Sequence, residues 1–123
     1  MNLDDVDRWM AGYIRAWTSN DAADVGALFT DDAAYRTEPY AEPWVGRAEI
    51  VRGWVEAKDE PGTWEFRSEP LALAGEVAFV RGWTTYTDGE PRTYHNLWVI
   101  EFADEGRARG FTEWFMKERR PKV

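Results

Sequence analysis

Residues 76–116 read EVAFVRGWTTYTDGEPRTYHNLWVIEFADEGRARGFTEWFM. Three runs rich in apolar and aromatic residues are separated by two turn-rich clusters, TDGEP at 87–91 and ADEG at 103–106. Glycine, aspartate and proline favour tight chain reversals, so this pattern predicts three antiparallel strands joined by short turns. The alternating residues 64–67 add a strand before them, which makes four consecutive strands.

Three polar residues stand among the large apolar residues of these strands: Arg81, Asn96 and Glu113. A strand sends every second side chain to the same face, so each of the three shares a face with aromatic residues. Those neighbours are Phe79, Trp83, Trp98, Phe111 and Phe115. A packed core seldom accepts a cation, an amide and a carboxylate together, whereas a ligand cavity uses a few polar groups to orient its guest. We therefore predict a small-molecule pocket.

The part of the chain before these strands has helical periodicity. Apolar residues recur at spacings of three and four from Leu3 to Trp17. The predicted elements are a helix over about 3–18 capped by Asn2, a second helix ending near Thr30, a strand over 33–37 and a third helix opening at Gly46. Helices grouped before a strand meander indicate an α+β fold, with one domain spanning residues 1–123.

Composition narrows the possible functions. The chain of 123 residues has no cysteine and one histidine, which argues against disulfides and against an all-protein zinc or iron site. A net charge of -8 disfavours nucleic acid and anionic membranes as partners. The sequence shows no signal-peptide pattern and no membrane-length apolar run, so we expect a cytoplasmic protein without a metal or cofactor.

Several segments resemble a known superfamily. Residues 13–21, 27–33 and 45–50 look like the N-terminal half of nuclear transport factor 2-like proteins. Residues 94–102 and 111–115 are similar to the C-terminal strands of its SnoaL-like branch. The resemblance implies a cone-shaped, curved antiparallel sheet wrapped around three helices, with a cavity at its wide end. It also implies a homodimer through the outer sheet face, to which parity assigns Leu97 and Val99.

The ketosteroid isomerase relatives in this superfamily imply particular site residues. Tyr13 matches their helix-one tyrosine, and Glu38, before Pro39, matches their base if the loop shifts by one residue. Their protonated aspartic acid falls at Trp98, which cannot act as an acid. The resemblance therefore implies chemistry different from steroid isomerisation, or a binding function without chemistry.

Glu113 is the leading catalytic candidate because burial on an aromatic face favours its protonated form and brings its pKa toward neutrality. The competing interpretation is a buried ion pair with Arg81, which would keep Glu113 ionised and structural. Asn96 and Arg81 would stabilise negative charge on a ligand, together with Tyr13. Parity directs His95, the single histidine, away from the pocket, toward solvent or a dimer interface.

Aromatic residues predict the nature of the ligand. A cavity lined by indole and phenyl rings favours a flat, hydrophobic guest such as a polyketide or terpenoid. The predicted lining residues are Trp17, Tyr35, Thr37, Trp54, Trp83, Trp98 and Phe115. Two functions remain open: a cofactor-free lyase, isomerase or cyclase that uses Glu113 or Glu38, and a binding module with the same cavity and no chemistry.

Overall fold

The computed structural model describes residues 1–119 of the chain. Within them, helices precede a strand meander, as predicted. The helices are α1 (Leu3–Ser19), α2 (Ala22–Gly26) and α3 (Arg47–Glu56), with a 3₁₀ turn at Asp104–Gly106. The strands are β1 (Phe29–Arg36), β2 (Trp44–Val45), β3 (Trp64–Ala74), β4 (Val77–Tyr86), β5 (Arg92–Phe102) and β6 (Ala108–Lys117).

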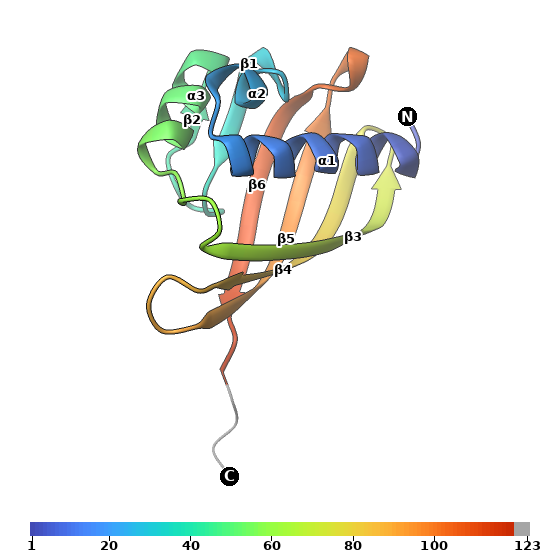
Figure 1. Cartoon of the computed structure of the whole chain (residues 1–123). Helices are drawn as coiled ribbons and strands as arrows, with labels where there is room; N and C mark the ends of the chain where they lie inside the picture. Colours follow the sequence, from blue (N-terminus) through green and yellow to red (C-terminus); the bar gives the residue numbers. More distant parts are fainter. Residues whose placement is uncertain (120–123) are drawn as a thin grey trace.

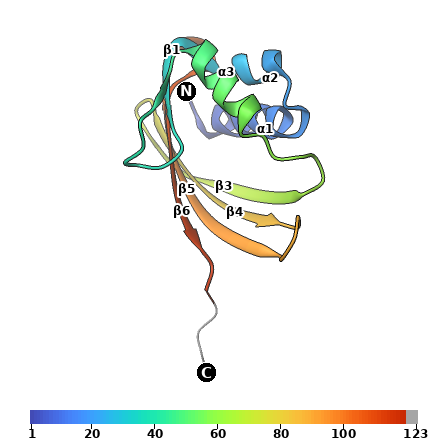
Figure 2. The same ribbon diagram turned by 90° about the vertical axis from the view of Figure 1, so that its left-hand side faces the viewer.

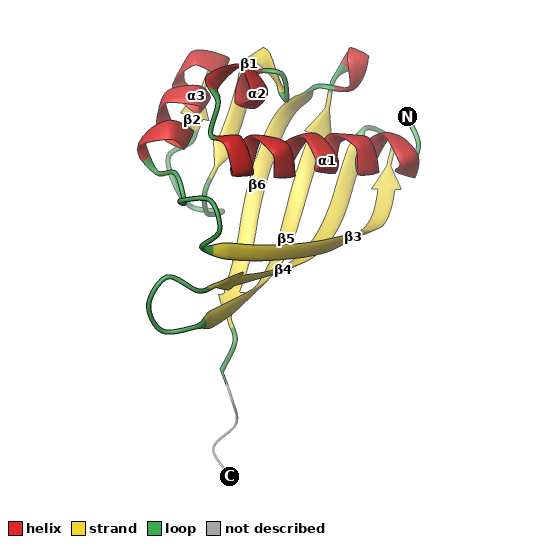
Figure 3. Ribbon diagram, viewed as in Figure 1, coloured by secondary structure: helices red, strands yellow, loops and turns green. Residues whose placement is uncertain are grey.

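One sheet contains all six of these strands, in the order β2-β1-β6-β5-β4-β3. Strands β3 to β6 form the predicted antiparallel meander, while β1 adds to β6 in parallel. The helix α1 crosses one face of the sheet, and α2 and α3 lie over the end that carries β1 (Figure 1). The sheet curls around the side on which the helices lie (Figures 2 and 3). The α+β cone expected from the sequence is confirmed.

The first helix shows how the sequence positions the core. The Asn2 side-chain oxygen accepts a hydrogen bond from the Asp5 backbone N–H at 3.1 Å. The Asp5 carboxylate accepts one from the Asn2 backbone N–H at 2.8 Å, which completes a reciprocal capping box. Asn20 ends the helix in the left-handed region at φ 51°. The side chains buried against the sheet are Val6, Trp9, Met10, Tyr13, Ala16 and Trp17.

The chain after α1 differs from the predicted boundaries. The second helix ends at Gly26 rather than near Thr30, and β1 already begins at Phe29. Phe29 is fully buried and pairs with Ala108 of β6. Leu28 therefore lies in a turn and Phe29 begins a strand, which periodicity over so few residues does not distinguish from a helix end.

Strand β4 faces the helices with the opposite set of residues from the one predicted. Arg81 is exposed on the outer face, as is its salt-bridge partner Glu69 on β3. Trp83 lies on the same outer face, under the guanidinium of Arg67 at 3.9 Å from the ring centroid. The prediction that Arg81 and Trp83 line the pocket is therefore wrong.

The reason is steric. A Cβ atom at position 82 would lie 2.6 Å from the Phe66 ring, which covers β4 from the neighbouring strand. The same ring stacks on Trp98 of β5, with centroids 5.0 Å apart. Rings from β3 and β5 fill the space above the middle of β4, and the inward positions there carry no aromatic residue; Tyr86, at the end of the strand, lines the cavities.

Candidate functional site

Glu113 of β6 lies at the centre of a hydrogen-bonded group on the concave face. It pairs across the sheet with Trp98, whose indole Nε1 donates a hydrogen bond to Glu113 Oε2. The Asn96 amide Nδ2 lies 3.3 Å from both carboxylate oxygens. The sequence prediction placed these three residues on one face, and the structure brings them into contact.

A further residue orients the Asn96 amide. The Thr84 hydroxyl, buried on β4, donates to Asn96 Oδ1 at 2.8 Å. The amide oxygen is thereby occupied, and the amide nitrogen points to Glu113. Thr84 thus helps to determine which atoms of Asn96 face the carboxylate.

Burial raises the pKa of Glu113 to about 7, and the hydrogen bonds from Asn96 and Trp98 act in the opposite direction. None of the ion pairs formed among residues 1–119 includes Glu113. The proposed partner Arg81 lies on the other face of the sheet with Glu69. The ion-pair interpretation of Glu113 is therefore wrong, and the carboxyl group is poised to exchange a proton near neutral pH.

Two buried tyrosines supply hydroxyl groups. The hydroxyls of Tyr13 on α1 and Tyr35 on β1 are 2.8 Å apart. Burial raises the pKa of both phenols, and the negative charge of Glu113 adds to the effect, so both stay protonated at neutral pH. Their mutual hydrogen bond uses one hydroxyl hydrogen, which leaves the other hydrogen for a ligand.

Two neighbouring cavities meet at Glu113. The inner cavity, of about 180 Å³, is lined by Tyr13, Tyr35, Trp54, Trp98 and other aromatic residues. The outer cavity, of about 340 Å³, is lined by Arg92, Tyr94, Asn96 and Phe115. Both are also lined by Asp59, Thr84, Tyr86 and Glu113. A ligand that spans them would touch the carboxyl group from either side.

Most of the predicted site residues line these cavities. Those in the inner cavity are Tyr13, Trp17, Tyr35, Thr37, Trp54, Trp98 and Glu113, and those in the outer cavity are Asn96, Glu113 and Phe115. Glu38 lines neither cavity, because it lies in the loop after β1 beside Tyr40. His95 lies on the outer face, where its Nε2 is 2.9 Å from Glu118.

Sequence reasoning missed other lining residues. They are Trp44, Ala57, Lys58, Asp59, Thr84, Tyr86, Arg92 and Tyr94. Arg92 and Tyr94 share the parity of Asn96 and Trp98, so strand alternation in β5 was a sufficient signal for both. Asp59 had no such signal, because it lies in the loop after α3. The Trp17 indole Nε1 donates a hydrogen bond to Asp59 Oδ2 at 3.0 Å.

A larger hollow of about 640 Å³ lies away from this site, along α1 and the turn between β3 and β4. Its charged lining residues are of both signs, and Arg8 is already paired with Asp5. We therefore place the candidate site at Glu113. Among residues 1–119, no group of three or more His, Cys, Asp or Glu side chains gathers as a metal would require, and no helix there is long and apolar enough to cross a membrane.

Solved structures share this fold. An NTF-2-like protein of unknown function from Burkholderia xenovorans has a TM-score of 0.76 at 17% identity, over 99% of this chain and 91% of that one. A putative ketosteroid isomerase from Kribbella flavida has a TM-score of 0.71 at 21% identity, over 98% and 84%. An LEH-like epoxide hydrolase from M. tuberculosis has a TM-score of 0.68 at 16% identity, over 92% and 84%.

Sequence similarity gives a more specific assignment than these structural likenesses. No curated protein sequence is detectably similar to this chain. The family model described as a SnoaL-like domain, however, matches residues 10–110, which run from within α1 to the beginning of β6. The chain therefore belongs to the SnoaL-like domain family.

Proposed function

We propose that this protein is a cofactor-independent enzyme that moves a proton on a hydrophobic carbonyl compound, with Glu113 as its acid and base. The proposal rests on the location of this carboxyl group, its lack of a cationic partner and its raised pKa. Glu113 lines both cavities and has no cationic partner among residues 1–119, and burial raises its pKa to about 7. A group with such a pKa is matched to proton transfer at neutral pH.

The chemistry follows from the groups present. The Glu113 carboxylate removes a proton from the carbon next to the carbonyl. A C–H bond breaks and an O–H bond forms on Glu113. The electron pair of the broken C–H bond moves to the carbonyl oxygen. The hydroxyl of the Tyr13 and Tyr35 pair whose hydrogen is not used in their mutual hydrogen bond donates a hydrogen bond to the resulting enolate oxygen. Glu113 then returns the proton to another carbon, which is isomerisation, or to a departing hydroxyl group, which is dehydration.

The hydrogen bonds to Glu113 suit this cycle. When Glu113 is ionised, Asn96 and Trp98 donate to the carboxylate and hold its orientation. Among the structural relatives, one is named a putative ketosteroid isomerase and another an LEH-like epoxide hydrolase. Those names are consistent with small-molecule chemistry in this fold, although Trp98 occupies the position where the resemblance to ketosteroid isomerases places an acid.

A binding module is the second candidate. The observation in its favour is that Asn96 and Trp98 already donate to Glu113, so the carboxyl group has partners without any substrate. In that case the cavities would hold a hydrophobic ligand and Glu113 would serve only to orient it.

Hydrogen–deuterium exchange of a carbonyl compound separates the two functions. We expect the protein to accelerate the exchange of the α hydrogens of α-tetralone, a flat enolisable ketone, in heavy water. Glu113→Gln should reduce this exchange by about 100-fold or more while binding persists. Glu65→Gln makes the same change at an exposed residue of β3 and should have no effect. The measurement is deuterium incorporation by mass spectrometry, corrected for the uncatalysed rate.

Two results would count against catalysis. Unchanged exchange in the Glu113→Gln variant would remove the assignment of that residue. Binding of the ketone without accelerated exchange in the wild-type protein would favour the binding module.

The oligomeric state is part of the proposal. We infer a homodimer through the outer sheet face, on which Leu97 and Trp114 are cross-strand neighbours and both are exposed. Val99 lies on the same face.

A further inference from the structure

Arg92, the first residue of β5, supplies a cation to the outer cavity. It lines that cavity together with Glu113, Tyr94 and Phe115. Sequence reasoning expected a cavity arginine at Arg81, which lies on the other face of the sheet. The structure has an arginine at the cavity, but at a different position and at its outer end.

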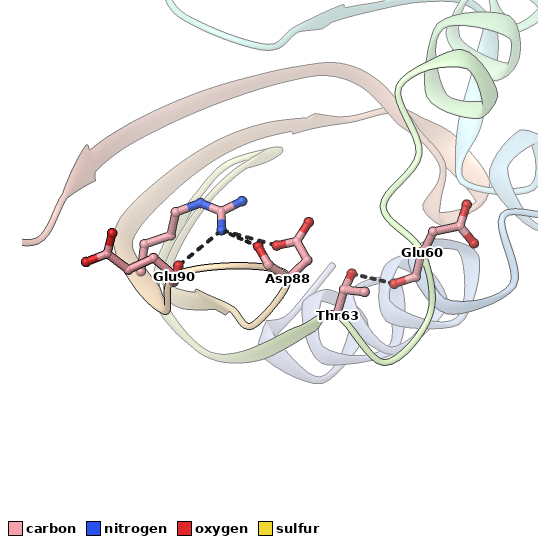
Figure 4. Close-up of polar contacts among 5 residues, drawn as sticks. Glu60, Thr63, Asp88 and Glu90 are labelled. Atoms are coloured by element: carbon pink, nitrogen blue, oxygen red, sulfur yellow. Dashed lines mark hydrogen bonds and ion pairs between the residues drawn. The ribbon is translucent and has the colours of Figure 1, made fainter.

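The Arg92 side chain is held in place before any ligand arrives. Its Nη1 lies 3.2 Å from the Asp88 carbonyl oxygen, 3.1 Å from Asp88 Oδ1 and 3.5 Å from the Glu90 carbonyl oxygen (Figure 4). Its guanidinium carbon lies 4.8 Å from the centroid of the Tyr86 ring. A side chain fixed in this way loses less entropy when a ligand binds.

The turn that holds Arg92 is itself tied down. Across from Asp88, the Thr63 hydroxyl donates to the Glu60 carbonyl oxygen (Figure 4). The Thr63 carbonyl oxygen accepts a hydrogen bond from the Thr87 amide at 2.8 Å. The loop before β3 therefore supports the turn between β4 and β5, and both fix the outer end of the cavity.

One edge of the guanidinium is unused. Within residues 1–119, the hydrogen bonds of Arg92 all run through Nη1, so Nε and Nη2 are left without a protein partner. These two nitrogens form the fork that binds a carboxylate with two parallel hydrogen bonds. Asp88 occupies only Nη1, so a carboxylate at this end would meet the two open nitrogens of a cation. Beside ionised Glu113 it would meet negative charge.

We propose that Arg92 binds the carboxylate of a flat aromatic keto acid whose carbonyl end lies at Glu113. This inference rests on the proposed function, and it narrows the substrate class from hydrophobic carbonyl compounds to those that carry an acid at the end remote from the reacting carbon. Tyr94 and Phe115, whose rings meet edge to face at 5.8 Å between centroids, form aromatic walls for the ring system.

Calorimetric binding of two matched compounds tests the inference. The probes are α-tetralone with a carboxylate on its aromatic ring and the methyl ester of that acid. We expect the wild-type protein to bind the acid at least about tenfold more tightly than the ester. Arg92→Met should abolish the preference, and Arg92→Lys should retain part of it. Arg67→Met, on the outer face, should leave it unchanged.

A further variant separates ligand binding from support of the turn. Asp88→Asn removes the counter-charge at Nη1 but keeps the guanidinium, so preference for the acid should persist or increase. The inference is overturned if the wild-type protein binds acid and ester equally tightly or binds neither compound. It is also overturned if the preference for the acid is unchanged in Arg92→Met or is lost in Asp88→Asn. Deuterium exchange in the bound acid tests Glu113 separately: tight binding through Arg92 without exchange contradicts only the proposed catalysis.

Discussion

At the scale of single residues, the raised pKa of Glu113 makes the free energy of unfolding depend on pH. The pKa is about 7 in the folded protein and near 4.5 for an unperturbed glutamate. The folded state therefore holds a proton that the unfolded state releases between these values. Since stability falls with pH wherever the folded state binds more protons, the contribution of Glu113 is greatest below the lower pKa and is lost as pH rises to about 7.

Glu113→Gln should remove this pH dependence because the amide does not ionise. We expect the variant to gain stability relative to the wild-type protein by roughly 2 kcal/mol between pH 5.5 and pH 8. Urea unfolding at the two pH values measures the difference. A stability gap between variant and wild type that stays constant over this range would show that burial does not perturb the carboxyl group.

At the scale of elements, strand alternation predicted two of the three inward faces. In β5 and β6 the inward residues are large and include Trp98 and Phe111, so the aromatic face and the buried face coincide. In β4 Phe79 and Trp83 face outward, and the inward face holds Ala78, Val80, Gly82 and Thr84, with Tyr86 only at the end of the strand. The size of a residue indicates burial only when no neighbouring strand already fills the space above it.

Gly82 offers a test of that explanation. Gly82→Val introduces a side chain where the Phe66 ring already lies, and we expect it to lower the free energy of unfolding by about 1–3 kcal/mol. Arg81→Val, one residue along and outward, breaks only an exposed ion pair and should cost about 1 kcal/mol or less. Thermal and urea unfolding provide the comparison.

The double variant makes the Gly82 test specific. Phe66→Ala removes the ring that the valine meets, so adding it to Gly82→Val should cost less than the sum of the two single changes. Additive costs would mean that Gly82 is required for some other reason, such as its backbone conformation.

At the scale of the whole molecule, the fold was more predictable from sequence than the site. The helix α1 and the strand meander leave local patterns in the chain, and the resemblance to a known superfamily implied that the sheet forms a cone. The cavities are also lined by Asp59 from the loop after α3, which long-range folding brings to the site. Glu113 and Asn96 were found because they lie in regular strands, and Asp59 was missed because no periodicity governs a loop.

The outer face of the sheet carries exposed apolar side chains that no other part of the described chain covers. The described helices lie on the other side of the sheet (Figure 2). Trp114 and Met116 are 50% and 75% exposed there, and Leu97 pairs with Trp114 across the strands. Exposed apolar side chains gathered on one face mark an interaction surface, and two copies related by a twofold axis can pair the same patch with itself.

We expect the wild-type protein to be a dimer in solution, with Trp114→Glu shifting it to the monomer because a carboxylate would be buried without a partner. Leu97→Glu should act in the same direction. Val55→Glu is the matched control: Val55 is 38% exposed, as Leu97 is, but lies on α3 on the opposite side. Sedimentation velocity measures the mass of each variant. A wild-type monomer at micromolar concentration, or dissociation caused equally by Val55→Glu, would contradict pairing through the outer face.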